Sequence, residues 1–245
     1  MPWTEKQIKQ HKKAAKLLDY IKNDALDFIK KYSTTTEYQV QKFILHQFKK
    51  YSLINEVYDP IVAFQKNTSY VHYFPKRQGT RLQPNSLILI DIWARLKETN
   101  APYADITWMA HRGKKPRKKI LDIFSIIIRA RDTGVKEIEK YLKNKKIPTG
   151  KMIDTAVRNY ITKKGYGANF PHGTGHILGI RSPHGTGGNI HCTNQEELND
   201  NVGYTIEPGI YLADGFGIRS EINIIVTNEL NLIITTPPQK RLTAV

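Results

Sequence analysis

Acidic residues inside apolar, β-branched runs are the feature of this sequence that most restricts its fold. The run LILIDIW places Asp91 at the end of one predicted strand, and YADITWM places Asp105 within the next. A polar turn with Asn100 and Pro102 separates the runs, so we predict a hairpin. A buried carboxylate is costly unless it is paired or binds a cation, and two facing one another would repel unless a metal neutralises both. Considered alone, each aspartate is more typical of a turn or a strand end.

Three later segments also place an acid or an imidazole beside an apolar strand or a glycine-rich turn. In PHGTGHILG, His172 and His176 are four residues apart, and the glycines allow close backbone approach. A lone histidine in such a segment is more often a hydrogen-bonded core residue. TIEPGIY contains Glu207 and GIRSEINIIV contains Glu221, each in a β-like context. Together with the two aspartates, these oxygen and nitrogen groups suit two adjacent divalent ions better than one tetrahedral structural zinc.

The composition is that of an ordinary globular protein. Of the 245 residues, 40% are hydrophobic and 24% are charged, which argues against wholesale disorder and suits one domain over residues 1–245. No run approaches the roughly 18 apolar residues of a membrane span, and the lysine-rich start lacks a secretory signal. The single cysteine, Cys192, excludes an internal disulfide and is consistent with a reducing compartment. We therefore predict a cytoplasmic protein with no membrane partner.

The net charge of +16 raises the question of a nucleic-acid partner. The densest basic run, HRGKKPRKK, extends from His111 to Lys119, and the other lysines are scattered over predicted helical faces. The sequence contains no known nucleic-acid-binding motif and no evenly spaced aromatic residues between the basic ones. Solvated surface lysine is therefore the preferred explanation, and nucleic acid is an unlikely partner.

The order of the remaining elements predicts an α+β protein. Helices alternate with β-like runs in the first two thirds of the chain, and glycine-rich turns and β-like runs fill the last third. A capping box of Thr36 and Gln39 marks the start of the second helix. The helices are predicted over residues 5–31, from Thr36 onward, over residues 119–131 with a further stretch to 143, and from Thr149 to Ile161.

Six segments, in their order along the chain, resemble those of the pita-bread metallopeptidases. This family includes methionine aminopeptidase, aminopeptidase P and prolidase. The resemblance covers the whole chain and implies a curved antiparallel sheet with helices packed on its outer face. The segments that carry it are NTSYVHYFP, LILIDIWARL, YADITW, FPHGTGHILG, TIEPGIYL and FGIRSEI.

The resemblance implies two divalent metal ions and assigns their ligands. Asp91 matches the ligand that binds one ion through both oxygens, and Asp105 matches the aspartate that bridges both ions. Glu207 is also the candidate general base, which takes a proton from water and passes it to the leaving amine. Manganese, cobalt, iron and zinc all suit these ligand types, and manganese or cobalt is favoured. The implied metal ligands are Asp91, Asp105, His176, Glu207 and Glu221.

The resemblance also assigns residues around the metals. His72 resembles a histidine that contacts substrate, His172 the first histidine of the family's HxxGH motif, and His184 a histidine that contacts the scissile peptide. Tyr211 matches a tyrosine near the metals. Arg219 resembles an arginine that supports the first aspartate in proline-directed members. Catalytic roles are thus expected for His72, His172 and His184 beside Glu207.

These resemblances favour an Xaa-Pro aminopeptidase or Xaa-Pro dipeptidase that acts on peptides. Methionine aminopeptidase is the first alternative, and an inactive binding module, associated with nucleic acid, is the second. The chain departs from the family pattern at Trp93, where a glycine is usual, and at Gly185, where glutamate is common. All predicted ligands are retained, so these departures concern the choice of substrate. A homodimer is left open.

Overall fold

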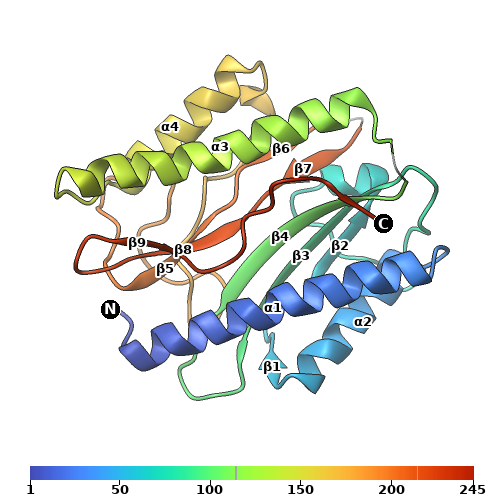
Figure 1. Ribbon diagram of the computed structural model, residues 1–245, viewed down its shortest axis with the longest axis horizontal. Helices are drawn as coiled ribbons and strands as arrows, with labels where there is room; N and C mark the ends of the chain where they lie inside the picture. Colours follow the sequence, from blue (N-terminus) through green and yellow to red (C-terminus); the bar gives the residue numbers. More distant parts are fainter. Residues whose placement is uncertain (114, 214) are drawn as a thin grey trace.

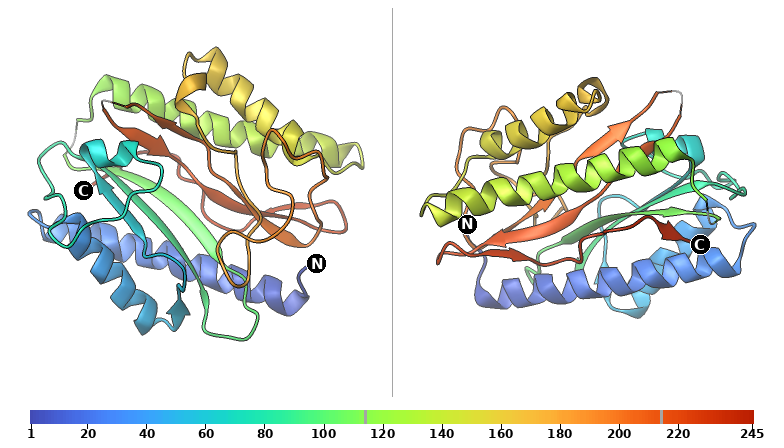
Figure 2. Two further views of the ribbon diagram at one scale, coloured as in Figure 1. Left: turned by 180° about the vertical axis from the view of Figure 1, so that it is seen from behind. Right: turned by 45° about the horizontal axis from the view of Figure 1, so that its top comes forward.

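The computed structural model describes residues 1–113, 115–213 and 215–245. Long strands lie between two layers of helices, with α1 on one side and α3 on the other (Figure 1). Figure 2 shows α2 beside α1 and α4 beside α3, so each layer contains one long and one shorter helix. The helices are α1 (Glu5–Lys31), α2 (Glu37–Lys50), α3 (Lys118–Lys143) and α4 (Gly150–Lys163), with short 3₁₀ helices η1 (Gln65–Ser69) and η2 (Gly167–Asn169).

Side-chain caps define the starts of three of these helices. Thr36 and Gln39 form the predicted capping box at α2, and Thr4 and Gln7 form another at α1. Thr149 caps α4 by accepting a hydrogen bond from a backbone N–H of the first turn. The predicted helix starts at Thr36 and Thr149 are therefore confirmed.

The third helix differs from the prediction. The sequence predicted one segment over residues 119–131 and a further stretch to 143, but α3 is one continuous helix. It contains Gly134, which lowers helix propensity but allows α3 to lie close to its neighbours. A Cβ atom at Gly134 would approach Val157 of α4 to 3.2 Å and Ile206 to 3.3 Å. Tertiary packing therefore outweighs the local cost of this glycine.

The long hairpin is confirmed, with two corrections. Its strands are β3 (Leu87–Leu96) and β4 (Ala104–His111), so Asp91 lies in the middle of a strand and not at its end. In the register of the hairpin, Asp91 pairs with Thr107, and Asp105 pairs with Trp93. The two aspartates are therefore diagonal neighbours on one face rather than direct cross-strand partners.

The two faces of β3 pack against different helical layers. The even-numbered residues 88–96 share a core with α1 and α2. Leu87, Leu89 and Trp93 share a second core with α3 and α4. Because side chains alternate along a strand, Asp91 belongs to the second face, where it interrupts an apolar column. The site is therefore built on the side of the hairpin opposite α1.

The other strands complete the curved β layer. The β3–β4 hairpin is flanked by β1 (Leu53–Ile54) and β2 (Ile61–Phe64), which pair with β3, and by β10 (Thr243–Ala244), which pairs with β4. A second sheet has the order β5–β8–β9, and β6 and β7 form a two-stranded ribbon. Asn223 joins the two sheets by accepting a hydrogen bond from the backbone N–H of Asp105 at 2.9 Å. The bounds are β5 (Val202–Ile206), β6 (Gly209–Tyr211), β7 (Gly217–Arg219), β8 (Ile222–Val226) and β9 (Leu232–Ile234).

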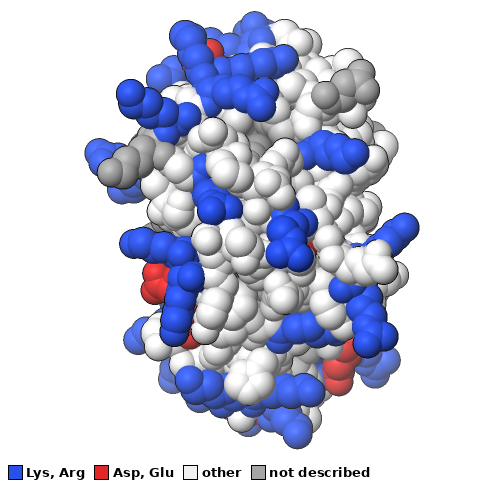
Figure 3. Space-filling view, turned by 90° about the vertical axis from the view of Figure 1, so that its right-hand side faces the viewer, with Lys and Arg blue, Asp and Glu red and all other residues white. Residues whose placement is uncertain are grey.

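Basic side chains are spread over the surface. Figure 3 shows Lys and Arg across most of the face in view, with few acidic side chains between them. The basic run from His111 to Lys119 includes Lys114, which lies outside the described residues; the rest of the run connects β4 to α3. Within the described ranges, no helix has the length and apolar character needed to cross a membrane.

Candidate metal centre

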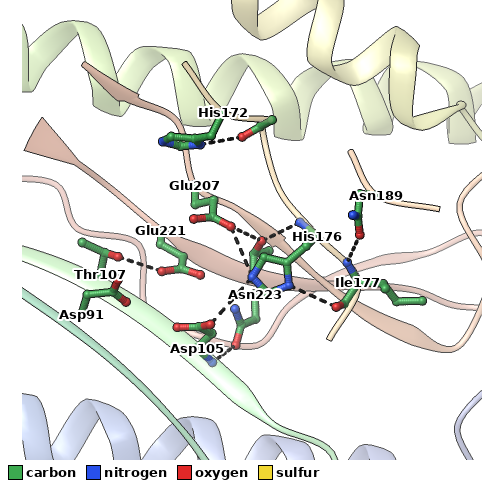
Figure 4. A network of polar contacts seen from close by, with 12 residues as sticks. Asp91, Asp105, Thr107, His172, His176, Ile177, Asn189, Glu207, Glu221 and Asn223 are labelled. Carbon is green, nitrogen blue, oxygen red and sulfur yellow. Dashed lines mark hydrogen bonds and ion pairs between the residues drawn. The ribbon is translucent and has the colours of Figure 1, made fainter. Parts of the chain in front are cut away.

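The five predicted ligands come together on the inner face of the β layer. Ligand atoms of Asp105, His176 and Glu221 all lie within 4.8 Å of one another. His176 Nε2 lies 3.8 Å from Asp105 Oδ2 and 3.3 Å from Glu207 Oε1 (Figure 4). Asp91 is on the same face of the hairpin as Asp105. The sequence-based ligand set is thus a spatial cluster drawn from four separate segments.

Strand pairing accounts for the positions of the two glutamates. Glu207 follows β5 directly and Glu221 precedes β8 directly. Because Ile206 pairs with Ile222 in the antiparallel ladder, the two glutamates extend from the same end of it. Glu207 and Pro208 separate β5 from β6.

His176 is held against β5 by backbone pairing. Its carbonyl accepts a hydrogen bond from Thr205 N at 2.9 Å, and its own N–H donates to Thr205 Oγ1 at 2.9 Å. This close approach requires a glycine before it, since a Cβ atom at Gly175 would lie 2.0 Å from the Thr205 carbonyl oxygen. The glycine of the HxxGH segment therefore serves backbone packing.

Hydrogen bonding assigns the tautomer of His176. Its Nδ1 lies 3.1 Å from the carbonyl oxygen of Ile177, so Nδ1 carries the hydrogen and donates it. Burial lowers the pKa of His176 to about 4, so the ring is neutral at pH 7. The Nε2 lone pair then faces the oxygens of Asp105 and Glu207. Acceptors that face one another in this way are satisfied by a proton or a metal cation between them.

The buried carboxylates of the cluster also have too little positive charge around them. Burial raises the pKa of Asp91 to about 6, although Arg219 opposes the shift. Burial and the neighbouring carboxylates raise the pKa values of Asp105 and Glu221 well above their usual range. Among the described residues, Asp105 Oδ1 and Glu221 Oε1 have no hydrogen-bond partner. Unpaired buried oxygens beside an imidazole lone pair fit divalent cations, so the residues present suit a metal centre.

A chain of hydrogen bonds connects Asp91 to the far side of the site. Arg219 contacts Asp91 through Nη2, and its Nη1 donates to the Tyr211 hydroxyl at 3.1 Å. That hydroxyl lies 3.0 Å from His172 Nε2, while His172 Nδ1 lies 2.8 Å from the Gly173 carbonyl oxygen. Since the carbonyl and the guanidinium fix the directions, Tyr211 donates to His172. The predicted contact between Arg219 and Asp91 is present.

Two polar residues of the site were missed from the sequence. Thr107 donates to Glu221 Oε2 at 2.8 Å and accepts from Arg219 Nε at 3.0 Å. Thr205 donates to Glu207 Oε1 at 2.9 Å. Strand alternation could have identified Thr107, because a residue two positions after Asp105 faces the same side.

Two adjoining cavities lie over the cluster. The larger has a volume of about 450 Å³, and the aromatic and aliphatic part of its lining includes Tyr58, Ile61, Phe74 and Trp93. The smaller, of about 200 Å³, includes His172 and two further residues that the sequence analysis did not assign, Asn189 and His191. Residues that line both cavities are His72, His176, His184, Glu207 and Arg219.

The three histidines predicted to surround the metals, His72, His172 and His184, line different parts of the two cavities. His72 and His184 stand where the two cavities meet, and His172 lines only the smaller one. The rings of His176 and His184 are 4.0 Å apart. Burial lowers the pKa of His184 to about 4 and also lowers that of His172, so both rings are neutral at pH 7. A neutral His184 can donate one N–H to a substrate oxygen, whereas both ring nitrogens of His172 already have partners.

Comparison with known proteins gives consistent results. The model of metallopeptidase family M24 matches residues 9–228. An uncharacterized peptidase of Staphylococcus aureus is 30% identical over 232 residues, which are 95% of this chain and 62% of that protein. The chain thus spans less than two thirds of the length of this relative.

Solved structures of other proteins superpose on the whole length of this chain. The X-Pro aminopeptidase of Thermotoga maritima superposes with a TM-score of 0.88 at 27% identity, covering 100% of this chain and 65% of that one. The Xaa-Pro dipeptidase of Bacillus anthracis gives 0.86 at 28% identity, covering 100% and 64%. The predicted α+β pita-bread fold is confirmed.

Proposed function

This chain belongs to metallopeptidase family M24, and we propose that it hydrolyses the peptide bond after the N-terminal residue of peptides with proline in second position. The observation that carries this proposal is the chain of hydrogen bonds from Asp91 through Arg219 and Tyr211 to His172. Of these residues, His172, Tyr211 and Arg219 are the positions at which the sequence resembles the proline-directed members of the family. The similarity to an X-Pro aminopeptidase and an Xaa-Pro dipeptidase supports the same choice.

We assign the cluster as the site of two divalent ions. When bound there, such ions activate water and polarise the scissile carbonyl group. Manganese, cobalt, iron and zinc all suit carboxylate and imidazole ligands, and manganese or cobalt is the ion to supply first. The proposed ligands are Asp91, Asp105, His176, Glu207 and Glu221.

Glu207 is the proposed general base. Its Oε1 accepts a hydrogen bond from the Thr205 hydroxyl, and this bond fixes the carboxylate where both cavities are lined by Glu207. From this place it can take a proton from water on one side and deliver it to the leaving amine on the other.

The histidines are proposed to bind the peptide. His72 and His184 line both cavities, so a peptide that extends from one to the other passes them. A neutral His184 can donate an N–H to the carbonyl oxygen as negative charge develops on it. The Nδ1 and Nε2 atoms of His172 are already engaged by Gly173 and Tyr211, so His172 is proposed to shape the wall of the smaller cavity.

Proline in second position changes what the site must recognise. It has no amide hydrogen and its φ angle is fixed, so recognition depends on the shape of the cavity rather than on an acceptor for that N–H. A discrimination that depends on shape is typically about 1–3 kcal/mol, or roughly 10- to 200-fold.

We also propose that the enzyme acts in the cytoplasm. The homodimer and the single domain over residues 1–245 stay predictions.

The test compares kcat/KM for Ala-Pro and Met-Ala peptides of matched length, with manganese or cobalt added. We expect the Ala-Pro peptides to be favoured. Preference for Met-Ala would overturn the proline assignment and indicate methionine aminopeptidase activity. Hydrolysis of neither, with no bound metal, would indicate a binding module.

A further inference from the structure

Two irregular segments supply three of the histidines that line the cavities, His72, His172 and His176. Residues 64–80 carry His72, and η1 is their only regular element after the end of β2. Residues 170–176 carry His172 and His176 and follow η2. Segments of this kind have few backbone hydrogen bonds of their own, so other contacts must fix their position.

A buried carboxylate of α2 holds the first segment along its length. The side chain of Glu37 is fully buried. Its Oε1 accepts from Phe64 N at 2.5 Å and Asn67 Nδ2 at 3.0 Å, and its Oε2 accepts from the Tyr73 hydroxyl at 2.7 Å and Thr80 N at 2.9 Å. One side chain therefore joins the start, the middle and the end of the segment.

The hydrogen bond between Glu37 and Tyr73 connects this fixed segment to the site. Tyr73 directly follows His72, and burial together with the Glu37 carboxylate raises the pKa of the Tyr73 hydroxyl. The hydroxyl therefore stays protonated and continues to donate. A displacement of Tyr73 would move the His72 backbone with it.

A second buried carboxylate, on α4, holds the other segment. Asp154 Oδ1 accepts from Thr174 N at 3.0 Å and Thr174 Oγ1 at 2.9 Å. Asp154 also pairs with Arg158, one helical turn away, through both carboxylate oxygens. Arg158 in turn donates to the carbonyl oxygens of Phe170 at 2.9 Å and His172 at 2.8 Å. The acid and the arginine together hold both ends of the segment around His172.

We propose that Glu37 and Asp154 are positioning residues that act on hydrolysis through different histidines, Glu37 through His72 and Asp154 through His172. The inference extends the proposed function, because it assigns the residues that set the geometry of the same site. Their described hydrogen-bond partners do not overlap, and they project from α2 and α4, which lie in different layers. The two carboxylates therefore hold the two segments through separate hydrogen bonds, and Arg219 is a described contact that both segments share, because its Nη1 donates to the Val71 carbonyl and to the Tyr211 hydroxyl, which contacts His172.

Double-mutant cycles on kcat/KM test this assignment. Glu37→Gln keeps the shape of the side chain but presents an amide N–H₂ to donors, and Asp154→Asn does the same on α4. A displacement of about 1 Å can cost on the order of 10²-fold in rate, so we expect each single variant to lose roughly 10- to 100-fold. Each cycle combines one of these variants with His72→Ala or His172→Ala.

The matched and crossed pairs should behave differently. Glu37→Gln should add less than about threefold to the loss in His72→Ala, because the histidine through which it acts is already gone. The same change should multiply with His172→Ala, and Asp154→Asn should show the reverse pattern. Losses that multiply in all four pairs, or that couple equally in all four, would overturn the proposal and indicate a general effect on stability.

Hydrogen exchange gives a readout that does not require turnover. Glu37→Gln should lose amide protection in residues 64–80 and keep it in residues 170–176, with the opposite result for Asp154→Asn. Tyr73→Phe removes one contact and serves as the milder variant if Glu37→Gln does not fold. If the wild type cleaved none of the peptides, the proposed function would fail. If either variant lost amide protection equally in both segments, the positioning roles would be overturned.

Discussion

The acidic cluster and the Glu37 side chain are both buried carboxylate sites, and they differ in how their oxygens are satisfied. Each oxygen of Glu37 accepts hydrogen bonds from neighbouring groups. In the cluster, Asp105 and Glu221 each have an oxygen without a described partner, and the carboxylates raise one another's pKa. The satisfied carboxylate of Glu37 maintains the fold, whereas the unpaired oxygens of Asp105 and Glu221 leave room for a cation. Unpaired buried oxygens thus distinguish these two acids from Glu37, although Asp91 and Glu207 of the same cluster do have partners.

The largest expected effect is that of Asp105→Asn. The substitution removes a charge that the proposed ions require, so we expect kcat/KM to fall by at least ~10³-fold. The metal-free protein should be as stable as the wild type or more stable, because repulsion within the cluster is relieved. Urea unfolding in chelator measures this stability, and a marked loss would contradict the description of the cluster as unsatisfied.

Glu37→Gln should give the opposite pattern in stability. The amide group would face donors that now bind the carboxylate, which leaves buried polar groups unpaired. We expect the free energy of unfolding to fall by about 2–4 kcal/mol, measured by urea unfolding, with metal binding retained by the folded fraction. Stability equal to that of the wild type would contradict the structural role.

A similar contrast separates two buried histidines. Both ring nitrogens of His11 have partners, the Tyr103 carbonyl and the Thr235 hydroxyl, whereas Nε2 of His176 faces acids. Burial lowers the pKa of His11 from 6.5 to about 4. Its neutral form therefore contributes stability that is present above pH 6.5 and is lost as the pH falls through about 4.

We expect this titration to reduce the free energy of unfolding by as much as ~3 kcal/mol over that range. His11→Gln lacks the titration, so its stability should depend less on pH than that of the wild type. Chelator in both samples removes the contribution of bound metal. Parallel pH profiles for the two proteins would contradict the lowered pKa.

The smallest expected effect is that of Thr107→Val. The substitution keeps the shape of the side chain but removes the hydroxyl between Glu221 and Arg219. Loss of a group that orients a metal ligand typically costs about 10- to 100-fold, and we expect the lower figure in kcat/KM. Wild-type activity would show that the hydroxyl does not orient Glu221.

The ligands could be predicted from the sequence as a set and not one by one. An acid in an apolar strand, such as Asp91 or Asp105, is by itself more typical of a turn or a strand end, but four segments of this kind in a family-like order indicate a metal centre. The diagonal relation of the two aspartates could not be predicted, because it depends on the register of the hairpin. The continuity of α3 at Gly134 likewise depends on packing against α4.

The positioning residues were not predicted, for a different reason. Glu37 is an acid in the first turn of a helix, where acids are common and need no further explanation. Its partners Phe64, Tyr73 and Thr80 are 27, 36 and 43 residues away, and their contacts exist only in the folded chain. Local sequence patterns therefore identify the chemistry of the site better than the groups that hold it in place.

Metal content per chain tests the central claim most directly. The wild type, Asp105→Asn and Glu37→Gln are loaded with manganese or cobalt, freed of excess ion by dialysis and analysed for metal. The account predicts up to two ions per chain in the wild type and in folded Glu37→Gln, and a clear loss in Asp105→Asn. A wild type that binds no ion, or an Asp105→Asn variant that retains the full content, would contradict it.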